Sequence, residues 1–140
     1  MEHTIHERFQ LGDRDVRETS ALSLAFLGDA VYELVIRTVL VERGGKPHEI
    51  SQKKSRLVNA AAQAQIAEAL RDGGVLTEEE LAVFRRGRNA NPHTTARHAS
   101  VHAYHKATGL ECLMGYLYLS GRTERLVELV SVGLAALEAH

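Results

Sequence analysis

Residues 18–43 read ETSALSLAFLGDAVYELVIRTVLVER, a long and largely apolar segment with an acid near its middle. Leucine and valine recur in it at helical spacing, polar residues that can cap a helix precede it, and two glycines follow it. The pattern predicts one long helix. Gly28 and Asp29 are both poor residues for a helix interior and together cost about 1.5 kcal/mol relative to alanine. An aspartate buried among apolar side chains also needs a compensating partner, so we expect this helix to carry a functional acid.

The rest of the chain predicts further helices and no sheet, because aromatic residues make up only 5% of it and prolines number two. Helices are expected over about 48–72 (one helix, or two joined near 56–59), 77–88, 101–119 and 123–138. Residues 1–18 are charged and aperiodic and are expected to form a loose arm. Residues 89–99 read as a loop of functional length. We therefore predict an all-α fold with a single domain over 19–140.

Composition limits the cellular setting. A chain of 140 residues with 44% apolar side chains suits one compact domain. Cys112 is the only cysteine, which excludes an intrachain disulfide and favours a core thiol in a reducing compartment. The N-terminus lacks the features of a signal peptide, and no apolar stretch is long enough to span a bilayer. The sequence predicts a soluble cytoplasmic protein with no membrane partner.

A second acid, Glu111, lies between glycines in another apolar segment. Two helices that each bring a carboxylate and close-packing glycines to a buried face would suit Mg²⁺ and phosphodiester hydrolysis. The alternative is structural: Asp29 could bond to backbone or to Arg37 or Arg56, and Glu111 could belong to an exposed polar stripe. Glu33 could be a third ligand, although an i,i+4 pair with Arg37 is favoured.

Net charge is −1, yet the charges are unevenly spread. Residues 81–110 contain no acid, and a second acid-free stretch covers 50–67. Such a distribution is typical of a protein that grips phosphates with one face. The alternative is a solvated helix end whose arginines complement the helix dipole. The candidate RNA contacts from these stretches are Lys53, Arg56, Arg85, Arg86, Arg88, Asn89 and Arg97.

Four histidines, His93, His98, His102 and His105, follow the arginine cluster. Their spacing could place zinc ligands on one helix face, but no cysteine or second-helix acid completes a set. Phosphate contacts are the favoured interpretation.

These motifs together resemble the ribonuclease III catalytic domain. LAFLGDAVYE at 24–33 is similar to its signature helix, and ECLMGYLYL at 111–119 to its second carboxylate helix. The branch most resembled is Mini-ribonuclease III, which consists of the catalytic domain alone. It is supported by RGRNA at 86–90, SRLV at 55–58 with QA at 63–64, and TEEE at 77–80. In keeping with that branch, we expect no double-stranded-RNA-binding domain in this protein. The resemblance runs from about residue 22 to residue 129.

The resemblance implies an all-helical homodimer that cleaves double-stranded RNA with Mg²⁺, or with Mn²⁺ in its place, and leaves 5′-phosphate and 3′-hydroxyl ends. The implied substrate is the precursor of large-subunit (23S) ribosomal RNA, with assistance from a ribosomal protein. Asp29 matches the essential aspartate and Glu111 the metal-binding glutamate. Residues 85–89 match the basic motif of the branch, and the loop to about Ser100 matches the segment near the RNA.

The chain departs from the wider family where it has Leu22, Ala25 and Thr108 in place of further acids, so a four-carboxylate metal cluster is not implied. Ala61 and the pair His105-Lys106 also differ from the branch and put its RNA preference in doubt. The rival hypothesis is a non-catalytic helical module that binds RNA or the ribosome. A helix-turn-helix DNA-binding protein is disfavoured, since no short glycine turn introduces a basic recognition helix.

Overall fold

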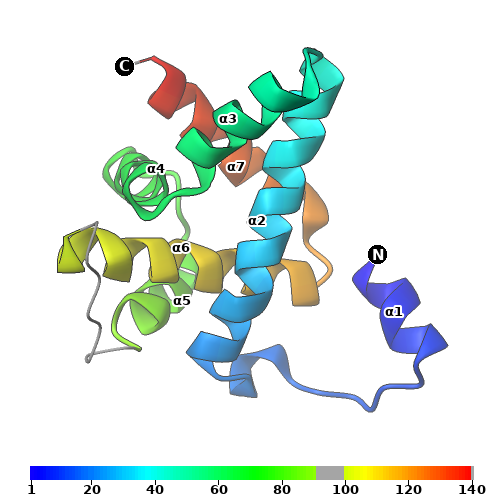
Figure 1. The fold of residues 1–140 in the computed structure, drawn as a ribbon. Coiled ribbons are helices and arrows are strands. Elements are labelled where there is room, and N and C mark those ends of the chain that lie inside the picture. Colours follow the sequence, from blue (N-terminus) through cyan, green and yellow to red (C-terminus); the bar gives the residue numbers. More distant parts are fainter. Residues whose placement is uncertain (91–99, 140) are drawn as a thin grey trace.

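A computed structural model describes residues 1–90 and 100–139, and every regular element in that part of the chain is a helix (Figure 1). The all-α prediction is confirmed. The predicted bounds 101–119 and 123–138 match the last two helices. In chain order the elements are α1 (Glu2–Arg8), the 3₁₀ turn η1 (Val16–Glu18), α2 (Ala21–Arg43), α3 (Pro47–Val58), α4 (Ala60–Asp72), α5 (Glu78–Arg88), α6 (Val101–Leu119) and α7 (Thr123–Glu138).

Short polar side chains set the helix ends. The Ser20 hydroxyl caps α2 by accepting a hydrogen bond from the Ser23 N–H, and α2 ends at Gly44, whose φ is +86°. Asn59 has extended backbone angles, and its side chain accepts a hydrogen bond from the Ala62 N–H at 2.8 Å. This cap divides residues 47–72 into α3 and α4, so of the two alternatives for this segment the structure has two helices.

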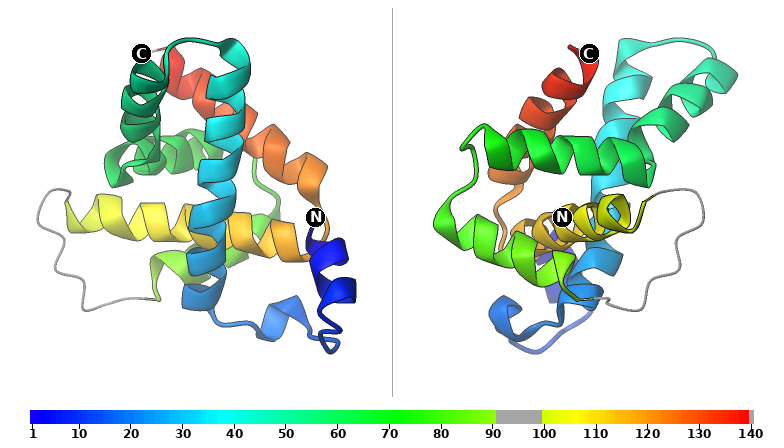
Figure 2. Two further views of the ribbon diagram at one scale, coloured as in Figure 1. Left: turned by 45° about the vertical axis from the view of Figure 1, so that its right-hand side comes forward. Right: turned by 90° about the vertical axis from the view of Figure 1, so that its left-hand side faces the viewer.

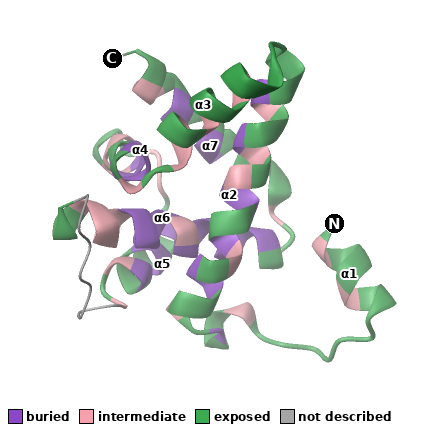
Figure 3. Ribbon diagram, in the orientation of Figure 1, coloured by how far each residue is buried: buried purple, intermediate pink, exposed green. Residues whose placement is uncertain are grey.

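The N-terminal arm contains more regular structure than its sequence predicts. Residues 1–18 were expected to be loose, but they include the short helix α1 and the turn η1. None of the α1 residues is buried, and Figure 3 shows this helix exposed beside the helical body. The turn is held locally, because the Asp15 carboxylate accepts hydrogen bonds from the backbone N–H and guanidinium of Arg17. Local bonds of this kind need no periodic apolar face, which explains why periodicity missed them.

Helix α6 forms the centre of the domain. Every residue from Ala107 to Tyr118 is buried except Glu111, which is half-buried. Helices α2, α4, α5 and α7 pack around it, and Figure 2 shows α2 crossing it. A helix that is apolar on all sides belongs in a core. Cys112 is fully buried there, and burial raises the pKa of its thiol to about 11, which confirms the prediction of a core thiol.

Two glycines allow α2 and α6 to cross at close range. A methyl group added to Gly28 would overlap the carbonyl oxygen of Glu111, and one added to Gly115 would overlap the carbonyl oxygen of Leu24. Only a residue without a side chain permits this approach. Because Asp29 follows Gly28 in α2, the crossing brings Asp29 and Glu111 together.

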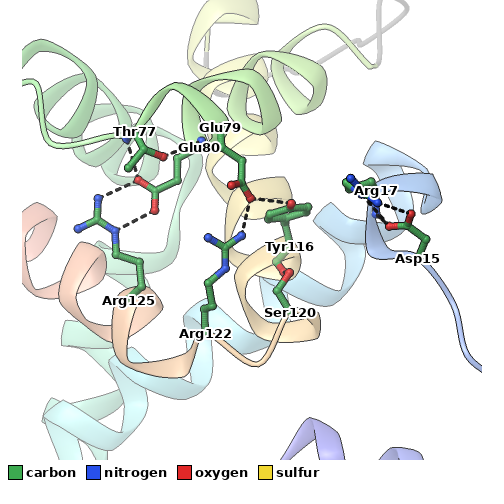
Figure 4. A network of polar contacts seen from close by, with 9 residues as sticks. All are labelled: Asp15, Arg17, Thr77, Glu79, Glu80, Tyr116, Ser120, Arg122 and Arg125. Carbon is green, nitrogen blue, oxygen red and sulfur yellow. Dashed lines mark hydrogen bonds and ion pairs between the residues drawn. The ribbon is translucent and has the colours of Figure 1, made fainter.

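A polar network fixes the start of α5 to α7 (Figure 4). Thr77 and Glu80 form a capping box at the start of α5. The Glu80 side chain is 1% exposed, and both of its carboxylate oxygens accept hydrogen bonds from Arg125 at 2.8 Å. The neighbouring Glu79 carboxylate accepts a hydrogen bond from the Tyr116 hydroxyl at 2.7 Å. These contacts hold the acidic end of α5, and its arginine-rich end points away from them.

Candidate active site

The site consists of two carboxylates at the crossing of α2 and α6. Asp29 comes from the middle of α2 and Glu111 from the middle of α6, and the two side chains lie within hydrogen-bonding range of each other. The structure thus brings together the two acids that the sequence singled out. Two like charges at this distance repel each other unless a proton or a cation lies between them.

The environment of Glu111 favours its neutral form. Burial raises the pKa of the Glu111 carboxyl to about 8, and the neighbouring Asp29 carboxylate contributes to that rise. The side chain of Gln63 on α4 acts in the opposite direction and lowers this pKa. Glu111 also raises the pKa of the Tyr32 phenol, whose main perturbation is its own burial. Two carboxyl groups therefore lie close together, and a bound cation would neutralise the negative charge of their ionised forms.

Asp29 itself is exposed, and the expectation that it would be buried is wrong for the chain considered alone. The reason is that α2 turns one face away from the domain. Phe26 on that face is 84% exposed, and Leu22 and Leu34 are also exposed. Neither Arg37 nor Arg56 bonds to Asp29 among the hydrogen bonds of residues 1–90 and 100–139, so the structural alternative of an arginine partner is not observed there.

Glu33 lies one turn beyond Asp29 and has a different partner. Its carboxylate accepts a hydrogen bond from Arg37 Nε at 2.7 Å. This is the i,i+4 pair that the sequence favoured over a role as a third metal ligand.

The basic end of α5 divides into residues with different roles. Arg85 and Asn89 are exposed, and Arg88 is half-buried. Arg86 donates a hydrogen bond to the Thr19 carbonyl oxygen at 3.0 Å and so ties α5 to the start of α2. A pocket of about 410 Å³ is lined by Arg88, Asn89, His102, His105 and Lys106.

The other basic candidates lie on α3 or outside the described residues. Lys53 and Arg56 are both exposed on α3. The end of that helix is held beside α2, because the Tyr32 hydroxyl donates a hydrogen bond to the Leu57 carbonyl oxygen at 2.7 Å. Helices α3 and α5 lie on either side of α6 in Figure 1. Arg97, together with His93 and His98, lies outside the described residues.

Comparisons with known proteins agree with this geometry. The family model described as "Ribonuclease III domain" matches residues 22–122, which include both carboxylates and the basic end of α5. The chain belongs to the ribonuclease III family. Among curated relatives it is 46% identical to Mini-ribonuclease 3 of Enterococcus faecalis over 84% of this chain and 90% of that protein. It is 44% identical to Mini-ribonuclease 3 of Brevibacillus brevis over 91% of this chain and 94% of that protein.

A solved structure supports the same assignment. The crystal structure of protein FN1578 from Fusobacterium nucleatum superposes with a TM-score of 0.77 at 31% identity, covering 88% of this chain and 98% of that one. The resemblance to the Mini-ribonuclease III branch is confirmed, and with it the ribonuclease III-type fold. As a member of the ribonuclease III family the chain is a hydrolase of the endoribonuclease class.

The donor set of this ribonuclease III-family site suits a metal that keeps most of its water. In residues 1–90 and 100–139 no three His, Cys, Asp or Glu side chains are grouped so as to hold a metal ion. The pair Asp29 and Glu111 supplies two carboxylates, and Mg²⁺ is commonly bound through one or two carboxylates with water completing its shell. Burial is the main cause of the raised pKa of Glu111, and the neighbouring Asp29 carboxylate adds to it, so a cation at this position would favour the ionised form. The residues present therefore fit Mg²⁺.

From the sequence, Gln63 was noted only as part of the QA motif at 63–64, and neither Gln63 nor Tyr32 was connected with the two acids. Gln63 is a buried polar residue in an alanine-rich helix, and that position in the apolar pattern could have revealed it. Tyr32 lies on the same helix as Asp29 but reads as an ordinary core aromatic. No helix among residues 1–90 and 100–139 is apolar enough over a sufficient length to cross a membrane.

Proposed function

We propose that this ribonuclease III-family member hydrolyses double-stranded RNA with Mg²⁺, for which Mn²⁺ can substitute. The observation that carries the proposal is the pairing of Asp29 with Glu111 at a crossing built by glycines. A binding-only protein gains nothing from two acids held together near phosphates, because they repel the RNA backbone. A metal-dependent phosphodiesterase needs such a pair.

Asp29 and Glu111 are the residues that would hold the ion. When bound, Mg²⁺ supplies an activated water and neutralises charge on the phosphodiester. Asp29 is exposed and can meet the RNA side of the site, whereas Glu111 is half-buried and anchored in the rigid core. Attack of water on phosphorus breaks the bond to the 3′ oxygen and leaves a 5′-phosphate and a 3′-hydroxyl.

Basic residues on α3 and α5 would bind the phosphates of the RNA duplex. A-form RNA is recognised mostly through phosphates and 2′-hydroxyls, which suits a basic helical surface with few aromatics. The exposed Lys53 and Arg56 on α3 and Arg85 on α5 can reach phosphates directly. The pocket at the end of α5 offers a further cationic site, and three of its five lining residues come from α6. The proposed contacts are Lys53, Arg56, Arg85, Arg86, Arg88, Asn89 and, outside the described residues, Arg97.

A second copy of the chain would complete the surface. Helix α2 exposes four large apolar side chains, Leu22, Phe26, Leu34 and Val41, and exposed apolar patches often mark protein interfaces. Asp29 is exposed on the same helix, so a partner covering these side chains would lie next to the acid pair. The homodimer is therefore part of the proposal, and residues 19–140 would be its catalytic unit.

The proposed substrate is the precursor of large-subunit (23S) ribosomal RNA in the cytoplasm, with a ribosomal protein assisting. Support comes from the relatives of this chain, which carry the name Mini-ribonuclease 3.

Cleavage of a long RNA duplex tests the function. The wild type is compared with Asp29→Asn and with Glu33→Gln, in MgCl₂ and in EDTA. Glu33 is the matched control, because it is an acid one turn away that is paired with Arg37. We expect cleavage by the wild type and the control in Mg²⁺, and none by Asp29→Asn or in EDTA. A wild type that binds the duplex without cutting it in Mg²⁺ or Mn²⁺ would favour the non-catalytic RNA-binding module.

A further inference from the structure

Gln63 has a buried polar side chain, and the proposed reaction assigns no role to it. It lies in the first turn of α4, where its backbone N–H donates to the Asn59 carbonyl oxygen at 3.0 Å. Its side chain is only 3% exposed, although glutamine is usually an exposed residue. The flanking Ala62 and Ala64 are small and buried, and α4 packs against α6.

The amide nitrogen of Gln63 has an incomplete set of partners. It is buried, and it has no hydrogen-bond partner in the part of the chain that the structure describes. The nearby acceptor is the Glu111 carboxyl, whose pKa the Gln63 side chain lowers. A buried donor left unsatisfied costs about 1–3 kcal/mol, so an apolar residue at this position would serve the fold better. A buried polar group that lowers the stability of the fold in this way indicates a functional role and not a packing role.

We infer that Gln63 is a positioning residue: its amide N–H holds one carboxylate oxygen of Glu111, so that the other oxygen faces Asp29 and the ion between them. The inference rests on the proposed function and adds a third helix, α4, to a site so far built from α2 and α6. Groups that bond to a metal's ligands fix the orientation of those ligands, and their loss commonly weakens metal binding about 10- to 100-fold.

The position of Gln63 agrees with this role. Asp29 is exposed, whereas Gln63 is buried, and both side chains influence the Glu111 carboxyl. Glu111 thus has an acidic neighbour on α2 and an amide neighbour on α4.

The test compares Gln63→Met with Gln65→Met. Methionine matches glutamine in length and lacks the amide, and Gln65 is the exposed glutamine on the same helix. Thermal unfolding is followed in EDTA and across a MgCl₂ series without RNA, and Mn²⁺ binding is measured by calorimetry. Duplex binding in EDTA and the Mg²⁺ dependence of cleavage complete the comparison.

For Gln63→Met we expect an unfolding midpoint in EDTA equal to or above that of the wild type. We expect the Mg²⁺ concentration for half-maximal stabilisation and half-maximal cleavage to rise about tenfold or more. Duplex affinity in EDTA should not change, and Gln65→Met should match the wild type throughout. In a Glu111→Gln background, Gln63→Met should cause no further loss of Mn²⁺ binding, because the two residues act through one contact.

Three results would overturn the inference. Unchanged metal affinity in Gln63→Met, with a wild type that cleaves, removes the role of Gln63 and leaves the proposed function intact. A lower midpoint in EDTA with unchanged metal affinity makes Gln63 a packing residue. A wild type that neither binds Mg²⁺ nor cleaves RNA overturns this inference together with the proposed function.

Discussion

The substitution Gly28→Ala has two effects of opposite sign on stability at the crossing of α2 and α6. Alanine is a better helix former than glycine by about 1 kcal/mol, so propensity alone predicts a more stable protein. The structure predicts the reverse, because the added methyl group would overlap the Glu111 carbonyl oxygen and come within 2.8 Å of the Gly115 nitrogen. Both obstacles are backbone atoms, which cannot rotate away.

The expected change in the free energy of unfolding is the cost of the steric overlap minus the gain in helix propensity. Overpacking costs about 1–3 kcal/mol, and more where a backbone must move. When the gain in helix propensity is included, we expect the free energy of unfolding to fall by about 2 kcal/mol. This lowers the midpoint of thermal unfolding by about 6 °C in a domain of this size. Separation of the two helices also moves Asp29 away from Glu111, and a misplacement of about 1 Å can reduce turnover about a hundredfold.

Thermal and urea unfolding with duplex cleavage measure both effects. Gly12→Ala is the control, since a methyl group there meets nothing within 4 Å. A Gly28→Ala protein as stable and as active as the wild type would refute the account of the crossing.

Four further predictions concern stability, assembly and RNA binding. Arg125→Met should lower the free energy of unfolding by about 3 kcal/mol at neutral pH, because it leaves the buried Glu80 carboxylate uncompensated. Hydrogen bonding to Arg125 holds the pKa of Glu80 below its usual value, so the stability it contributes is complete above pH 4.5 and is lost as pH falls through the lower, folded-state pKa. Glu80→Gln should therefore be less acid-sensitive than the wild type in urea unfolding between pH 6 and 3, and equal sensitivity would contradict this. Phe26→Asp should sediment as a monomer at micromolar concentration while Val127→Asp, an exposed site on α7, stays dimeric; two dimers would argue against the α2 face. Arg85→Ala should weaken duplex binding and reduce its salt slope by about 1, and an unchanged slope would exclude a phosphate contact.

The helices could be predicted from the sequence because their signals are local. The apolar spacing of α2 and α6 and the capping box of α5 each lie within a few consecutive residues. The short helix α1 was missed, since it is held by local backbone bonds without a buried face.

The two acids that the structure brings together could be picked out from the sequence, but their surroundings could not. Asp29 and Glu111 interrupt apolar helices next to glycines, a pattern that can be read along the chain. The exposure of Asp29 depends on which face of α2 the other helices cover, and the bond from Arg86 to Thr19 joins residues far apart in sequence. The proximity of Gln63 to Glu111 could not be predicted for the same reason, because it arises only after α4 has packed on α6.

The crossing of α2 and α6 has a consequence for the newly made protein. Its two acids come from opposite halves of the chain, so neither half alone can assemble the pair. In a chain still being synthesised the pair cannot form until α6 has emerged and packed against α2. A nuclease whose proposed target is ribosomal RNA would thereby remain harmless to the ribosome that is making it.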